Sequence, residues 1–166
     1  IGPDGHGTAM REGLAQAGVP LNRLTAAAHR VVHGGASLTA TCRVTPEVLR
    51  QIEACVPLAP LHNPGNLVGI QAVAALTADL PQYAAFDTAF HSTNPDVATT
   101  YALPLAERER GLRRYGFHGI SFAAIVRILR QEGRLPDRLL ACHLGNGCSL
   151  AAIVNGRSVA TTMGYS

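Results

Sequence analysis

The chain has 166 residues, of which 47% are hydrophobic and 15% are charged, a composition typical of a globular protein with an aliphatic core. Its formal net charge of +3 is too small to indicate nucleic-acid binding, and no apolar stretch reaches the ~18 residues that would predict a membrane span. The four cysteines have neither zinc-site nor disulfide spacing, so we interpret them as reduced thiols of a cytoplasmic protein.

The predicted elements mix helices with strands, which favours an α/β fold. In chain order they are a helix over 8–18, a strand over 24–32, a helix from 45, a helix over 69–80, a strand over 83–90, a helical stretch over 97–103, a helix over 121–131, and strands over 139–142, 149–154 and 157–162.

Local signals support several of these elements. Thr45 before Pro46 is a favourable helix start, because threonine caps free N–H groups and proline suits the first helical position. The prolines between 57 and 64 predict a loop that carries His62 and Asn63. The helix over 69–80 is apolar on nearly all sides, which indicates burial. Asn155-Gly156 predicts a two-residue hairpin turn.

Five short segments place polar residues beside glycines, prolines or aromatic residues, and these are 29–35, 60–64, 86–91, 114–121 and 143–149. In the first, Arg30 offers a planar fork of donors that suits a carboxylate or a phosphate, although a surface ion pair would explain it equally well. Asp87 ends an apolar strand, where a buried carboxylate needs a partner or a metal, unless it only caps the next turn. His118 precedes a helix start, a place of free N–H donors and positive potential.

The segment 143–149 reads His-Leu-Gly-Asn-Gly-Cys-Ser and lies between two strand-like runs. Its glycines allow positive φ values and close approach of a ligand to the backbone. A run of backbone N–H groups of this kind makes an anion-binding concavity suited to phosphate. A tight turn whose polar residues only satisfy the backbone is the alternative, and the spacing alone does not separate the two.

Together the five segments resemble the acetate kinases and their short-chain carboxylic acid kinase relatives, the acetokinase family. Arg-Arg-Tyr-Gly-Phe-His-Gly at 113–119 and His-Leu-Gly-Asn-Gly at 143–147 are the most specific matches, and the matching segments run in family order over nearly the whole chain. The resemblance implies the two-domain fold of the sugar kinases, Hsp70 and actin, which is of the ribonuclease H-like type. Here it would be incomplete at both ends, with 1–90 from the first domain and 91–166 from the second.

The resemblance also implies a reaction, the reversible transfer of the γ-phosphoryl group of ATP to acetate, with Mg²⁺, to give acetyl phosphate and ADP. In that reaction Arg30 would hold the acetate carboxylate and His118 would donate to the phosphoryl oxygens. Asp87 would act beside the metal and Arg30. The remaining implied roles are substrate contacts by Val32, Leu61, His62 and Phe117, and nucleotide contacts by His143, Leu144, Gly145, Asn146 and Gly147. The family's magnesium ligands would lie outside this chain, and the full-length protein would be a cytoplasmic homodimer that binds neither nucleic acid nor membrane.

Three residues depart from the family pattern. Ala36 replaces the usual acidic residue after His-Gly-Gly, and Ile120 and Phe122 replace a threonine and a histidine next to His118. The chain begins without methionine and is interpreted as a fragment that would be inactive alone. Two alternatives therefore stay open, namely a propionate or butyrate kinase and a non-catalytic remnant.

Overall fold

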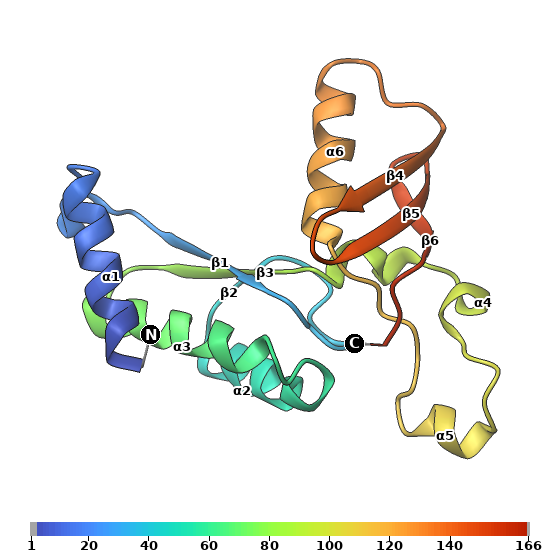
Figure 1. The fold of residues 1–166 in the computed structure, drawn as a ribbon, viewed down its shortest axis with the longest axis horizontal. Coiled ribbons are helices and arrows are strands. Elements are labelled where there is room, and N and C mark those ends of the chain that lie inside the picture. Colours follow the sequence, from blue (N-terminus) through green and yellow to red (C-terminus); the bar gives the residue numbers. More distant parts are fainter. Residues whose placement is uncertain (1–2, 166) are drawn as a thin grey trace.

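A computed structural model describes residues 3–165, and it has two lobes that meet at the ends of their strands (Figure 1). We call the part with the first sheet the first lobe and the part with the second sheet the second lobe. The first lobe contains α1 (Pro3–Gln16), β1 (Ala27–Val31), β2 (Cys42–Arg43), α2 (Pro46–Ala54), α3 (Asn63–Leu76) and β3 (Gln82–Phe86). The second contains α6 (Gly119–Gln131), β4 (Arg138–Leu144), β5 (Cys148–Val154) and β6 (Arg157–Thr161). The chain segment that links the two lobes forms an extended arm, which carries the short helices α4 (Asp96–Thr99) and α5 (Leu105–Glu109).

The first sheet has the strand order β1-β3-β2, with β1 parallel to β3 and β2 antiparallel to it. Parallel strands need a long crossover connection, which α2 and α3 provide. Residues from the sheet and both helices form the core of this lobe, which consists of Val31, Leu38, Ile52, Ile70, Ala84 and Phe86. The register Val31↔Phe86 aligns the carboxyl ends of β1 and β3, so the residues that follow both strands emerge together.

The second sheet is an antiparallel meander in the order β4-β5-β6, and α6 packs on it. Its core consists of Phe122, Val126, Ala141, Ala151 and Ile153. Asn155 and Gly156 both have positive φ values, 50° and 80°, between β5 and β6. This confirms the predicted hairpin, since a two-residue turn of this hand needs both residues in that region.

Several predictions about the first lobe are wrong in detail. Helix α3 begins at Asn63 and ends at Leu76, so the loop predicted up to residue 64 is too long and the helix predicted from 69 too short. Pro64 is compatible with this start because it occupies the first turn, where its missing N–H costs nothing. The predicted burial is also wrong, because Gln71, Ala74 and Ala75 are exposed and only Asn63 and Ile70 are fully buried.

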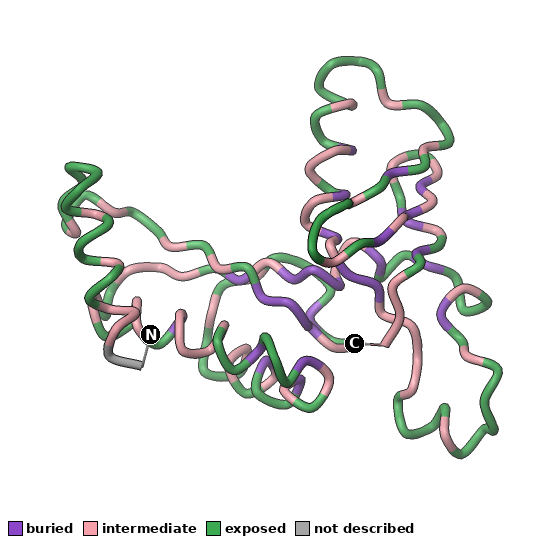
Figure 2. The backbone as a smooth tube through the Cα atoms, in the orientation of Figure 1, coloured by how far each residue is buried: buried purple, intermediate pink, exposed green. Residues whose placement is uncertain are grey.

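Other boundaries differ as well. Helix α1 starts at Pro3 rather than at residue 8, β1 is shorter than predicted, and β2 was not expected. The helix predicted over 97–103 is reduced to α4. The buried residues lie at the carboxyl ends of β1 and β3, along β5 and where the lobes meet, whereas α1 and the arm are largely exposed (Figure 2). Among residues 3–165, no helix combines the length and the apolar character needed to cross a membrane.

Candidate functional site

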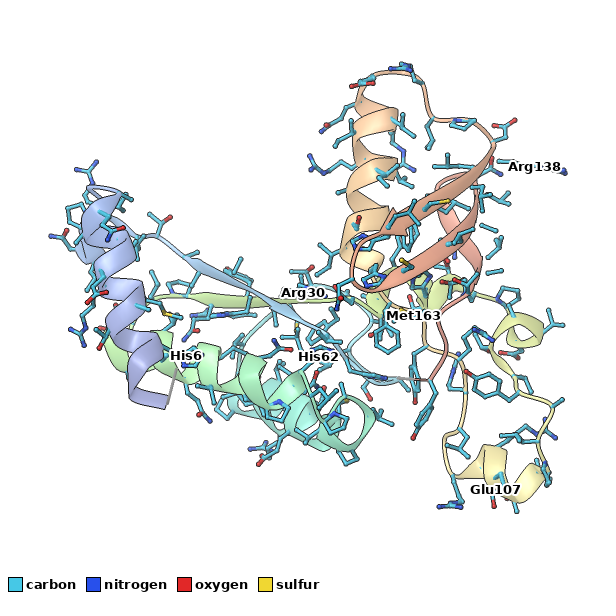
Figure 3. The ribbon with its side chains drawn as sticks, in the orientation of Figure 1. His6, Arg30, His62, Glu107, Arg138 and Met163 are labelled. Carbon is cyan, nitrogen blue, oxygen red and sulfur yellow. The ribbon has the colours of Figure 1, made fainter. Side chains whose placement is uncertain are left out.

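A cavity of about 470 Å³ lies where the two lobes meet, and we call it the large cavity. Arg30 and Val32 reach it from the end of β1, Asp87 from the end of β3, and His118 from the start of α6. Its other lining residues are Leu58, Ala59, Pro60, Leu61, His62, Phe117, Asn146, Gly147 and Met163. Arg30 and Met163 mark the junction between the lobes in Figure 3, although they lie far apart in the sequence.

Arg30 and Asp87 form an ion pair at the wall of this cavity. Arg30 Nε donates to both carboxylate oxygens of Asp87 at 3.2 and 3.1 Å, and Arg30 Nη2 donates to Oδ2 at 2.6 Å. The Asp87 side chain is 2% exposed and the Arg30 side chain is 61% exposed. The aspartate therefore fixes the guanidinium on one edge, while the other edge stays available to an anion in the cavity.

Backbone contacts hold this pair in place. The Asp87 N–H donates to the carbonyl of Val31 at 3.0 Å, which continues the ladder between the two parallel strands. The Gly119 N–H donates to the carbonyl of Asp87 at 2.9 Å, and a Cβ on Gly119 would collide with that carbonyl. Only glycine lets α6 start this close, so the helix start is tied to the segment that carries Asp87.

His118 caps α6 with a left-handed backbone, φ 58°, which is uncommon for a residue other than glycine. Its ring stacks on that of His143, with centroids 4.0 Å apart and planes inclined by 14°. Each imidazole also has a serine partner. His118 Nδ1 lies 2.8 Å from Ser149 Oγ, and His143 Nδ1 lies 3.1 Å from Ser121 Oγ. Strained backbone conformations of this kind concentrate at functional sites.

The charges around the cavity affect its ionisable groups. Partial burial lowers the pKa of His118, the nearby His143 lowers it further, and Asp87 opposes this while Arg30 adds to it. His118 is therefore a neutral imidazole at neutral pH. The hydrogen bonds to Asp87 raise the pKa of Arg30 above its already high value, so Arg30 is always charged.

The apolar part of the cavity lies next to Arg30. Val32, Ala59 and Phe117 are nearly fully buried there, and Met163 packs against them. Leu61 also lines the cavity but is 89% exposed. Sequence reasoning missed Ala59 and Met163, because an isolated alanine and methionine carry no motif.

A buried asparagine positions the strand end that carries Arg30 and Val32. Asn63 accepts a hydrogen bond from the His33 N–H at 3.1 Å and donates to the carbonyls of His33 and Ile52 at 3.0 and 3.2 Å. Asn66 accepts from the Val32 N–H at 3.0 Å. Sequence reasoning named Asn63 only as a loop residue and did not identify Asn66, one turn further along α3.

His143 and Leu144 end β4, and Gly145, Asn146 and Gly147 form the turn to β5. Asn146 and Gly147 line the cavity, His143 stacks behind His118, and the structure does not bring Leu144 or Gly145 to the lining. Neither glycine of this turn has a positive φ value. The glycine at 147 instead permits close approach, because a Cβ there would lie 3.3 Å from His118 Nε2.

The residues that depart from the family pattern lie in distinct places. Phe122 is fully buried in the core of the second lobe and makes an edge contact with His91, with ring centroids 5.7 Å apart. His118 keeps its orientation through Ser149 rather than through residue 122. Ala36 lies outside the large cavity.

The described residues do not fit a magnesium site of their own. Both Asp87 oxygens are engaged by Arg30, and residues 3–165 contain no group of three His, Cys, Asp or Glu side chains placed to hold a metal ion. We therefore assign no step to a metal held by these residues.

Comparisons with known proteins identify the family of this chain. The family model described as the acetokinase family matches residues 9–166. An acetate kinase of Rhodopseudomonas palustris is 50% identical over 155 residues, which cover 88% of this chain and 37% of that protein.

Two solved structures share the fold. An acetate kinase of Porphyromonas gingivalis has a TM-score of 0.82 and 41% identity, over 89% of this chain and 38% of that one. A propionate kinase of Francisella tularensis has a TM-score of 0.87 and 36% identity, over 95% and 41% of the two chains. The chain thus spans about two fifths of the length of these relatives, and the predicted α/β fold of the sugar kinase, Hsp70 and actin type is confirmed over the aligned part. By these matches the chain belongs to the acetokinase family.

Proposed function

We propose that this chain provides the carboxylate-binding side of an active site that transfers the γ-phosphoryl group of ATP to acetate. The observation that carries the proposal is the position of Arg30, which Asp87 holds at the edge of a cavity whose adjacent surface is apolar. A short carboxylic acid has the same two parts, an anionic head and a small apolar tail. Family membership supports the choice of ATP and acetate as the reactants.

In this proposal Arg30 binds and orients the acetate carboxylate by two-point contact. A carboxylate oxygen then bonds to the γ-phosphorus as the bond from phosphorus to the ADP oxygen breaks, which gives acetyl phosphate and ADP. His118 donates a hydrogen bond from its ring to a phosphoryl oxygen, and Asn146 and Gly147 face the ATP phosphates. Such a reaction needs positioning and charge neutralisation more than covalent help.

The acetate methyl group would contact Val32, Phe117 and Leu61, with His62 at the rim of the cavity. A propionate or butyrate kinase is the second candidate, and the similarity to a solved propionate kinase favours keeping it. An additional methylene in an apolar pocket changes discrimination by only about 1–3 kcal/mol, so these acids are separated by measurement of kcat/KM for each.

The remaining parts of the proposal rest on the resemblance. Mg²⁺ would accompany ATP, with ligands other than the residues described above. The protein would work as a homodimer in the cytoplasm, in organic acid metabolism that leads to acetyl-CoA. The division into one domain up to residue 90 and another from 91 is part of the same proposal.

A chimera tests the proposed function. Residues 9–166 replace the 50% identical segment of the Rhodopseudomonas palustris acetate kinase, and acetyl phosphate is captured as its hydroxamate. We expect the chimera to form acetyl phosphate and its Arg30→Gln variant to lose about 10³-fold in kcat/KM, as expected for loss of a charged contact in a preorganised site. A folded chimera with no acetate-dependent turnover would favour the non-catalytic alternative. The 166 residues alone are expected to show little turnover.

A further inference from the structure

A second cavity, of about 90 Å³, lies beyond the turn that follows β1. It shares no lining residue with the large cavity. The residues that matter for its chemistry are Ala36, Thr39, Thr88, Ser92, Arg113 and Arg114. Nothing in the proposed phosphoryl transfer uses this cavity.

The charged side chains that line this cavity are all positive. Two arginines line it and no aspartate or glutamate does. Among the ion pairs of the described residues, none involves Arg113 or Arg114. Arg114 is partly engaged, because its Nη1 donates to the carbonyl of Thr162 at 2.8 Å and its guanidinium lies over the Tyr101 ring. Neither arginine therefore has a counter-charge among the described residues, and Arg113 also lacks the carbonyl contact that holds Arg114.

The Nε atom of Arg113 is buried and has no hydrogen-bond partner among residues 3–165. A buried donor on a charged group is costly to leave without an acceptor. The Arg113 guanidinium lies 5.8 Å from the centre of the Tyr115 ring, which restricts its position but supplies no acceptor for Nε.

The other polar groups of this cavity are also suited to donate. Thr88 Oγ1 accepts a hydrogen bond from the Gly34 N–H at 3.1 Å, which leaves its own hydroxyl proton free to donate. Thr39 and Ser92 add hydroxyl groups at the exposed side. His91 adds no charge, because burial lowers its pKa and its ring nitrogens are engaged by Ser158 and by the carbonyl of Phe117.

We propose that this second cavity is a binding site for a small oxyanion of the phosphate or sulfate class, with Arg113 as its principal ligand. The guanidinium presents parallel donors that match two oxygens of such an anion, and the hydroxyl groups complete the shell. The volume accommodates a group of a few heavy atoms and is too small for a nucleotide. This inference does not depend on the proposed kinase activity.

The test follows the Arg113 Nε–H resonance directly. The protein as its gene encodes it is labelled with ¹⁵N-arginine, the resonance is assigned by its loss in Arg113→Lys, and inorganic phosphate is added at constant ionic strength with sodium chloride as the balancing salt. We expect a saturable shift of this resonance with phosphate and with sulfate. No response, or an equal response to chloride alone, would overturn the proposal.

Variants separate this site from the large cavity, whose Arg30 is also able to bind phosphate. In Arg30→Gln the Arg113 response should persist unchanged, and its disappearance would place the anion in the large cavity instead. Ala36→Glu places a carboxylate at the exposed side of the second cavity, where it can pair with Arg113. We expect it to weaken phosphate binding by about tenfold or more, as competition for a charged hydrogen bond implies. Ala36→Gln, of equal size without the charge, should weaken binding less, and equal affinities in all three proteins would contradict the proposal.

Discussion

The Arg30 side of the large cavity differs from the β4–β5 side in how its polar groups are held. On the Arg30 side, partners far apart in sequence hold one another, as Arg30 and Asp87 do and as Asn63 and His33 do. On the β4–β5 side, the turn is closed by local contacts, such as the Gly145 N–H to the Gly147 carbonyl at 3.2 Å. The first side is therefore preorganised for a ligand, whereas the second depends on His118 and its neighbours for its position.

The largest expected effect comes from removal of the charge on the preorganised side. Arg30→Gln should lower kcat/KM for acetate by about 10³-fold, since the carboxylate loses its charged partner. Steady-state assays of acetyl phosphate formation measure this in the chimera described above, which is also the protein for the other activity measurements below. Arg50→Gln is the matched control, because Arg50 is an exposed arginine that also pairs with an acidic residue, Glu47, and it should leave the rate unchanged. Equal losses of kcat/KM in both variants would show that the effect does not depend on the position of Arg30 in the cavity.

The hydrogen bonds of Asn63, which hold the end of β1 near Arg30, should contribute to the free energy of unfolding. Asn63→Ala leaves the His33 N–H and the His33 carbonyl without their side-chain partner and removes one of the two hydrogen bonds to the Ile52 carbonyl, so we expect a loss of about 3 kcal/mol in the free energy of unfolding. Urea unfolding measures it. Gln71→Ala on the exposed face of the same helix should change stability by less than about 0.5 kcal/mol. An Asn63→Ala protein as stable as wild type would show that this hydrogen-bond set does not hold the strand end.

A pH series tests the contribution of two buried histidines, His33 and His91, to the free energy of unfolding. Burial lowers the pKa of His33 and of His91, and His33 Nδ1 accepts the Gly35 N–H, so both rings are neutral when folded. Because the unfolded chain then binds more protons below about pH 6.5, their stabilising contribution is present above that pH and is lost as the pH falls. We expect the free energy of unfolding to fall between pH 6.5 and 5.5, by at most about 2 kcal/mol for the two groups. A free energy of unfolding that stays constant over this range would contradict it.

On the β4–β5 side, Ser149 should affect the reaction by orienting the His118 ring. Ser149→Ala removes the hydrogen bond to His118 Nδ1, which frees the ring to rotate, and kcat should fall about tenfold. Ser121→Ala, which acts only on the stacked His143, should cost less. The reverse order of the two effects would assign the orienting role to His143.

The smallest expected effect concerns the choice of acid. Val32→Ala enlarges the apolar surface next to Arg30 and should shift kcat/KM toward propionate over acetate by about 1 kcal/mol. Competition between the two acids in one assay measures the ratio. An unchanged ratio would place the methyl group elsewhere in the cavity.

Local chemistry made parts of this fold predictable. The helix start at Thr45 and Pro46 is confirmed, with Thr45 Oγ1 accepting from the Val48 N–H, and so is the Asn155-Gly156 turn. Both depend on two to four consecutive residues. The start of α3 was missed because proline is excluded from a helix interior but not from its first turn.

The assembly of the site was less accessible from the sequence. The motifs named Arg30, Asp87 and His118, but their meeting depends on the register of β1 with β3 and on the approach of α6 to Asp87. Asn66, Ala59 and Met163 carry no signal of their own, because their roles arise only from tertiary packing. Neither glycine of the turn at 145–147 uses a positive φ value, and the glycine at 147 serves close approach to His118, which depends on tertiary packing.

The most direct test of the preorganised Arg30 side is a double-mutant cycle on kcat/KM for acetate in the chimera, with Arg30→Gln, Asp87→Asn and the double variant. If Asp87 acts by holding Arg30, its replacement should cost much less once Arg30 is gone, so the double variant should be about as slow as Arg30→Gln alone. Losses that multiply in the double variant would show that the two residues act independently, and would contradict preorganisation of Arg30 by Asp87.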